Sequence, residues 1–286
     1  MTALRRRMDE DMIVRGMAER TREAYLWAVT GLAKFYRRSP DQISDAEVQA
    51  YLLHLIRDRQ RSWSTCNIVV HGLRFLYHTT LKRDRTTFAI PTPRQPGRLP
   101  ALLSREEVQR LIGQAANLRH RTMLLTAYAA GLRLNEVLHL HVTDIDSARM
   151  TIRVEQGKGG QDRYTVLSSH LLEALRAYWK VARPVDWLFP ARAGHRPMDP
   201  TSLQKAYQAA KRRAGITKPG GIHALRHAFA THLLEAGVDL HTIQRLLGHK
   251  SISTTTRYWH LTHASLTTQA ARLDLLDGLP PLPPPA

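Results

Sequence analysis

The chain has 286 residues, a length typical of about two domains. Hydrophobic residues make up 43% of it, enough apolar surface for folded cores, which disfavours disorder as the state of the whole chain. Lys and Arg number 42 against 24 Asp and Glu, so the formal net charge is +18 and a nucleic acid is the leading partner.

A membrane surface is the rival partner for so basic a chain, and the sequence favours it less. No unbroken apolar run approaches the ~18 residues that a membrane span needs, and no signal peptide opens the chain. Cys66 is the only cysteine, so no internal disulfide can form, and its apolar surroundings predict a small buried side chain. We therefore expect a cytoplasmic, nucleoid-associated protein.

The chain up to residue 90 predicts a helical domain, because apolar residues recur there at helical spacing. Ser44, followed three residues later by Glu47, is typical of a capping box at the start of a helix. Basic residues lie between the apolar positions. Any one of them is more often simply solvated, but together they suit a domain that lies on DNA phosphates. The predicted helices cover residues 21–38, 44–59 and 64–81.

Residues 91–103 contain four prolines and Gly97. Proline removes a backbone donor and blocks a helix, so we predict a linker here. Ser104 is the expected cap of the next helix, whose first-turn acids suit the helix dipole.

The second domain, residues 104–275, is predicted to be mostly helical with one β interruption. A long apolar helix is expected to break at Gly131 and resume. Residues 149–168 alternate apolar and polar side chains across a Gly-Lys-Gly-Gly turn, which indicates an antiparallel hairpin. The predicted helices cover residues 119–140, 168–182, 200–214, 223–237 and 239–250.

Beyond this domain core, residues 265–279 carry an amphipathic pattern that predicts a tail helix. Residues 276–286 are proline-rich, and we expect them to be disordered.

Two charged patterns in the second domain suggest chemistry, although each has a plain structural alternative. Arg133 and Glu136 are three residues apart and could pair on a helix turn, which by itself favours an ordinary surface ion pair. His223 and Arg226 share one helix face. His227 stands at zinc-pair spacing from His223, but no glutamate follows the first histidine, so a structural, hydrogen-bonded His227 is favoured, as is a structural His232 on the same helix.

Three further residues lie in turns or polar stretches. Lys158 stands in GKGG, which lacks the second glycine and the Ser or Thr of a phosphate-binding loop and alone indicates an ordinary turn lysine. His249 follows Gly248, where a helix is expected to end, so a capping histidine is one interpretation. Tyr258 has polar neighbours, unlike the other tyrosines, so it is either a nucleophile or an aromatic that packs a C-terminal helix.

In chain order, GLRLNE, GKGG, HALRHAFATHLL, LLGHKS and RYWH resemble the tyrosine recombinases, the site-specific integrases and recombinases related to type IB topoisomerases. The motifs span about residues 124–260, and their combination is far more specific than any single one. The resemblance implies a mainly α fold, a two-domain clamp. Its parts would be a helical, SAM-like core-binding domain and a mostly α-helical catalytic domain with a small antiparallel β-hairpin or sheet. Trp259 departs from the family pattern, in which many relatives have a small residue after the tyrosine, and removes no catalytic group.

The resemblance also implies how each catalytic residue acts. Arg133 and Arg226 would clamp the phosphate, and Lys158 would protonate the leaving 5′ oxygen. Tyr258 would be the nucleophile. The implied catalytic set is Arg133, Lys158, His223, Arg226, His249 and Tyr258.

The two histidines of this set would act on the phosphate and on the tyrosine. His223 would serve as a base toward Tyr258 or donate to the phosphate. His249 would donate to the scissile phosphate and help position Tyr258. No metal, ATP or other cofactor is implied.

The resulting hypothesis is a site-specific recombinase or integrase that cuts and rejoins double-stranded DNA through a 3′-phosphotyrosyl intermediate. It would act as a homo-oligomer, a tetramer on two DNA sites, to integrate or excise a mobile element. Three alternatives stay open: a recombinase that resolves chromosome or plasmid dimers, a DNA-binding relative without catalysis, and a monomeric type IB topoisomerase.

Overall fold

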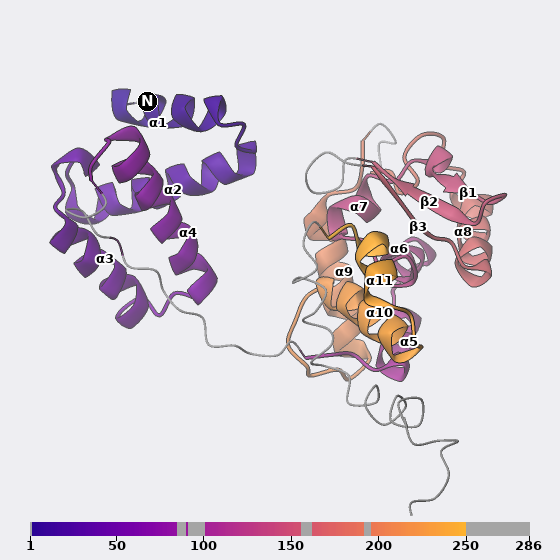
Figure 1. Ribbon diagram of the computed structural model, residues 1–286. Helices are drawn as coiled ribbons and strands as arrows, with labels where there is room; N and C mark the ends of the chain where they lie inside the picture. The colour runs from indigo at the N-terminus through magenta and orange to yellow at the C-terminus, as the bar shows by residue number, and fades with distance from the viewer. Residues whose placement is uncertain (1, 85–89, 91–100, 156–161, 192–195, 250–286) are drawn as a thin grey trace, which may run out of the picture. The chain divides into compact units, whose positions relative to one another are not determined.

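The computed structural model describes residues 2–84, 90, 101–155, 162–191 and 196–249. The chain divides into two compact units, Met1–Arg98 and Leu99–Ala286 (Figure 1). The expected fold class, mainly helical with a small antiparallel sheet, is confirmed. Across the described ranges, no helix combines the length and the apolar character that crossing a membrane requires.

Unit 1 contains the three helices that the sequence predicts, and a further helix precedes them. Its elements are α1 (Ala3–Val14), α2 (Glu19–Tyr36), a 3₁₀ turn (Pro40–Gln42), α3 (Asp45–Arg57), α4 (Trp63–Arg74) and a π-helical continuation of α4 (Phe75–Thr80). The predicted capping box is present: the Ser44 N–H donates to Glu47 Oε2 at 2.9 Å, and the Glu47 N–H donates to Ser44 Oγ at 3.3 Å. Cys66 is buried in the core of this unit, as expected.

Helices α2 and α4 approach each other closely in unit 1. A Cβ at Gly72 would lie 3.2 Å from the backbone of Tyr25 and 3.1 Å from the Ala28 side chain. Glycine at this position therefore lets the two helices form the centre of the unit.

Unit 2 carries seven helices in its described part and the predicted hairpin, β2–β3, to which a short strand β1 adds a third member. The sheet is antiparallel in the order β1-β2-β3, with Ile152 opposite Thr165 and Val154 opposite Arg163. The elements are α5 (Arg105–Gly113), α6 (Leu118–Ala129), α7 (Leu134–Leu138), a 3₁₀ turn (Val142–Asp144), β1 (Ile145–Asp146), β2 (Thr151–Val154), β3 (Arg163–Val166), α8 (Ser169–Ala182), α9 (Pro200–Arg213), α10 (His223–Glu235) and α11 (Leu240–Leu247).

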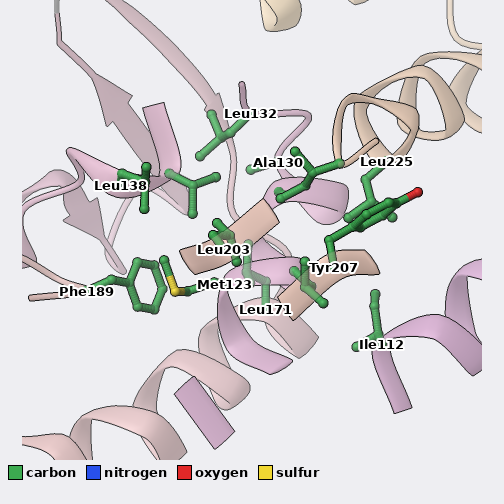
Figure 2. Packing of buried hydrophobic residues seen from close by; sticks show 14 of the residues in the cluster. Ile112, Met123, Ala130, Leu132, Leu138, Leu171, Phe189, Leu203, Tyr207 and Leu225 are labelled. Carbon is green, nitrogen blue, oxygen red and sulfur yellow. The ribbon is translucent and has the colours of Figure 1, made fainter. Parts of the chain in front are cut away.

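One apolar core joins most helices of unit 2, and a smaller second cluster packs α11 against α10. Figure 2 shows side chains from α5, α6, α8, α9 and α10 converging on the main core. Helix α10 is buried along most of its length, and α11 contacts both α10 and β3. The main core therefore fixes α10 and the sheet relative to each other, and α11 is held by its own packing against α10 and β3. The labelled examples are Ile112, Met123, Leu171, Leu203 and Leu225.

Candidate active site

The break between α6 and α7 positions the first candidate residue. Gly131 has φ +63°, and a Cβ there would lie 2.4 Å from the Phe229 ring, so only glycine fits this corner. The turn makes Arg133 the cap of α7. The predicted pairing of Arg133 with Glu136 is confirmed: the Arg133 N–H donates to Glu136 Oε2 at 2.8 Å, and its Nη1 donates to Oε1 at 2.6 Å.

Glu136 is the centre of a cluster that contains three arginines. Besides Arg133, Arg163 donates to both carboxylate oxygens at 2.9 and 2.7 Å, and Arg226 Nη1 lies 3.7 Å from Oε2. Burial alone would raise the pKa of Glu136, but the hydrogen bonds and charge of Arg163, with those of Arg133, lower it to about 2. Glu136 is therefore ionised at neutral pH.

The same three arginines bind the C-terminal end of α11. Each guanidinium donates to one of the last backbone carbonyls, where the helix dipole favours a positive charge. The pairs are Arg163 with Leu246 at 3.0 Å, Arg226 with Leu247 at 2.5 Å and Arg133 with Gly248 at 3.5 Å. The cluster thus ties α7, α10 and β3 to the end of α11.

Helix α10 carries His223 in its first turn and Arg226 one turn later. Arg226 is 1% exposed and also donates to the Gly131 carbonyl at 2.6 Å. The rings of His223 and His227 meet edge to face, with centroids 4.7 Å apart. Among the described residues, no group of three or more His, Cys, Asp or Glu side chains is placed to hold a metal ion.

His223 lies close to the arginines, and this changes its titration. Desolvation and, after it, the charges of His227, Arg226 and Arg133 lower its pKa to about 4, against the opposing effect of Glu136. The residue nevertheless lies exposed to solvent at the start of α10. A neutral imidazole at pH 7 can accept a proton from a neighbouring group.

His249 directly follows α11 and is held by its backbone. Gly248 adopts φ +62°, the left-handed conformation predicted for the end of this helix. The His249 N–H donates to the Gln244 carbonyl at 3.1 Å, and Gln244 Nε2 donates to the His249 carbonyl at 3.0 Å. Desolvation, followed by the charges of Arg226 and Arg133, lowers the pKa of His249 to about 4.

Four of the six catalytic candidates therefore meet in one place, within electrostatic reach of one another: Arg133, His223, Arg226 and His249. Lys158 and Tyr258 lie outside the described residues, as do the predicted tail helix and almost all of the predicted linker. The His232 ring nitrogen Nδ1 shares a 2.9 Å hydrogen bond with the Tyr128 hydroxyl. This confirms the prediction that His232 is a structural residue.

Sequence reasoning missed Arg163. The structure shows its place in β3, where Thr165 is buried while Tyr164 is 63% exposed and Val166 is 38% exposed. Since side chains alternate along a strand, Arg163 shares the inward face with Thr165. An arginine on the inward face of a hairpin strand needs a buried carboxylate, and Glu136 provides it.

The arrangement suits the binding of an anion. Within the described residues, the cluster sets three guanidinium groups against one carboxylate, with two histidines that are neutral at pH 7 beside it. Guanidinium groups bind phosphate oxygens in a planar, two-point geometry, and an imidazole N–H can add a further hydrogen bond.

The chain matches known proteins over nearly its whole length. It matches the Phage integrase family over residues 101–265 and the phage integrase N-terminal SAM-like domain over residues 4–87. It is 43% identical to an integrase/recombinase of Sinorhizobium fredii over 288 residues, covering 100% of this chain and 93% of the relative. It is 32% identical to the tyrosine recombinase XerD of Oceanobacillus iheyensis, covering 89% of this chain and 92% of the relative.

A solved structure supports the same relationship. The site-specific recombinase XerH bound to difH substrate, in a pre-cleavage complex, has 26% sequence identity and a TM-score of 0.65. The match covers 82% of this chain and 72% of that one.

Proposed function

Because the chain belongs to the phage integrase family, we propose that it is a tyrosine-type site-specific recombinase that cuts and rejoins double-stranded DNA through a 3′-phosphotyrosyl bond. The observation that carries the proposal is the arginine cluster around Glu136, with two neutral histidines at its side. Its excess positive charge matches the charge that develops on a phosphate under attack.

In the proposed reaction, the Tyr258 hydroxyl attacks the scissile phosphorus and the bond from phosphorus to the 5′ oxygen breaks. His223 takes the phenolic proton, which its neutral form at pH 7 permits. Lys158 donates the proton that the leaving 5′ oxygen needs. The 5′ hydroxyl of the partner strand then attacks the phosphotyrosine, which restores the tyrosine and joins the strands.

In this proposal Arg133 and His249 bind the phosphate oxygens, and Arg226 stabilises the phosphate through its charge. Arg133 is the more accessible arginine, with 24% of its side chain exposed. Arg226 is almost fully buried, so its charge acts on the phosphate from within the protein. His249, neutral at pH 7, donates its ring N–H. Two-point guanidinium contacts and an added imidazole bond would hold the phosphate in line for attack.

A groove of about 880 Å³ next to His223 supports DNA as the substrate. Lys205 and Arg212 of α9 line it together with the amide side chains of Gln204 and Gln208. Cationic groups bind backbone phosphates, and amides bind base edges or sugars. We assign this groove to the DNA next to the cleaved phosphate.

Membership of the family also indicates what each part of the chain does. We propose residues 1–90 as the core-binding DNA domain, 91–103 as the linker, 104–275 as the catalytic domain and 276–286 as a tail. Four protomers would assemble on two DNA sites at the nucleoid. Integration or excision of a mobile element is the proposed biological role, and resolution of chromosome or plasmid dimers is the second candidate.

Covalent trapping tests the proposed chemistry. Duplexes selected from a random library by binding to the protein are nicked near the bound centre, so that a cut releases a short strand and prevents rejoining. Wild type is expected to give a covalent protein–DNA band in denaturing gels, with and without EDTA, and Tyr258→Phe is expected to give none. A band that persists in the variant would assign the nucleophile to another residue.

Further assays separate the alternatives. A two-site plasmid assay reports recombination, and relaxation of a supercoiled plasmid that lacks the selected site reports a type IB topoisomerase. Binding without a covalent band, on duplexes nicked at each position across the site, would favour a DNA-binding relative without catalysis.

A further inference from the structure

Arg163, the first residue of β3, is the arginine of the cluster that the phosphate chemistry described above does not use. Its guanidinium makes a two-point bond with Glu136, with Nη1 to Oε1 at 2.9 Å and Nη2 to Oε2 at 2.7 Å. Its Nε donates to the Leu246 carbonyl at 3.0 Å. The planar fork therefore joins α7 to the end of α11.

Arg163 and Arg133 differ in how they face solvent. The Arg163 side chain is 10% exposed, whereas 24% of the Arg133 side chain is exposed. Arg133 reaches its α11 carbonyl only at 3.5 Å. Arg133 is therefore the arginine placed to meet a ligand, and Arg163 the one committed to protein groups.

Arg163 also supports the turn that carries His249. A Cβ at Gly248 would lie 2.7 Å from Arg163 Cδ, so the arginine stem packs directly against this residue, which has φ +62°. A shift of Arg163 would remove two of the hydrogen bonds that hold Glu136 and would leave the Gly248 turn without its packing partner. Both changes reach groups that are proposed to bind the phosphate.

We propose that Arg163 is a positioning residue for strand cleavage. Through Glu136 and the end of α11, it holds Arg133, Arg226 and His249 in the arrangement that receives the phosphate. This inference rests on the proposed recombinase function. Arg163 itself touches no substrate in it, so its loss should slow the chemical step more than it weakens DNA binding.

The test uses the full-length protein with Arg163→Met and the conservative Arg163→Lys. A matched control is Arg149→Met, which removes an arginine with 84% of its side chain exposed, paired only at the surface with Asp146 among the described residues. Single-turnover formation of the covalent complex is followed on the nicked duplex at saturating concentration, and the Kd for the same duplex is measured separately.

Arg163→Met should slow covalent complex formation by about 100-fold, since a misplacement of about 1 Å costs that much, while the Kd changes less than about threefold. Arg163→Lys keeps the charge but loses the fork, so a loss of about tenfold is expected. Arg149→Met should cleave at the wild-type rate.

A double-mutant cycle shows whether Arg163 acts through Glu136. If it does, the double variant Arg163→Met, Glu136→Gln should cleave no more slowly than the slower single variant. If the two residues act independently, the fold-losses in cleavage rate should multiply. Multiplied losses would overturn the proposal. So would a wild-type rate in Arg163→Met, or a Kd that rises as far as the rate falls.

Thermal unfolding shows whether each variant is folded. If Arg163→Met does not fold, the lysine variant decides: the expected result is slower cleavage with an unchanged Tm, and a wild-type rate contradicts the inference. The proposed function fails separately, because in that case wild type itself would form no covalent complex on any nicked duplex.

Discussion

The ion pairs of unit 1 and the cluster around Glu136 in unit 2 use arginine in different ways. In unit 1, Arg22 pairs with Asp9 at 2.8 Å and Arg15 lies 3.8 Å from Asp11, in partly exposed one-to-one ion pairs. In unit 2, three arginines share the single carboxylate of Glu136, which is 8% exposed. A one-to-one surface pair is already neutral, whereas the shared carboxylate leaves positive charge for an incoming anion. The arrangement of arginines, more than their number, therefore identifies the site.

The energetic consequences differ in the same direction. Exposed ion pairs stabilise a protein by about 0–1 kcal/mol because water screens them and the side chains lose entropy. Buried charges must be compensated, and removal of one partner costs about 3–5 kcal/mol. Mutations in the cluster of unit 2 are thus expected to lower both the stability and the cleavage rate. Mutations in the ion pairs of unit 1 should change both quantities much less.

The largest effect is expected for Arg226→Gln in unit 2. The variant loses a charge that acts on the phosphate as it is attacked, so the single-turnover cleavage rate should fall by about 10³-fold. The measurement is covalent complex formation on the nicked duplex at saturating concentration. A rate within tenfold of wild type would mean that the buried arginine serves the fold alone, and the contrast between the two units would lose its functional meaning.

The next effect in size is on stability. Glu136→Gln keeps the shape of the side chain but removes the carboxylate that three arginines share, so unfolding free energy should fall by about 3 kcal/mol at pH 7. Urea unfolding of wild type and variant measures it. Glu173→Gln, on the solvent side of α8, is the control and should unfold like wild type. An unchanged midpoint for Glu136→Gln would show that the arginine charges are compensated by other groups.

The cluster also predicts a pH dependence. The pKa of His249 is lowered from 6.5 to about 4 in the folded protein, so the unfolded chain binds its proton first as pH falls. Its contribution to stability is complete above pH 6.5 and is lost as pH falls toward 4. His223 adds an effect of the same sign, which its exposure to solvent weakens.

Unfolding in urea at pH 7 and pH 5 measures this loss, and His249→Gln should show a smaller difference between the two. NMR titration of the imidazole gives the pKa directly. If His249 titrates near 6.5, the arginines do not act on it, and the site is less desolvated than the geometry indicates.

The sequence predicted the elements and most of the candidate residues of unit 2, since helix caps, the Gly131 break and the hairpin are local signals. Arg133 and Glu136 are three residues apart, so their pairing could also be predicted. The contact between Arg163 and Glu136 could not, because 27 residues separate them and only the packing of β3 against α7 and α11 brings them together. The three carbonyls at the end of α11 were invisible for the same reason.

The smallest effect belongs to unit 1 and tests the other half of the contrast. Arg22→Ala removes the pair with Asp9, a 2.8 Å contact in which both side chains are about one-fifth to one-quarter exposed. Screening by water and the regained side-chain entropy should keep the loss of unfolding free energy below about 1 kcal/mol. Urea unfolding of the full chain, followed by the fluorescence of Trp27 and Trp63 after replacement of the tryptophans in unit 2, reports this unit alone. A loss near that of Glu136→Gln would show that unit 1 also depends on buried charge. Arginine pairing would then no longer distinguish the two units, and only the sharing of one carboxylate would separate the site from the rest of the surface.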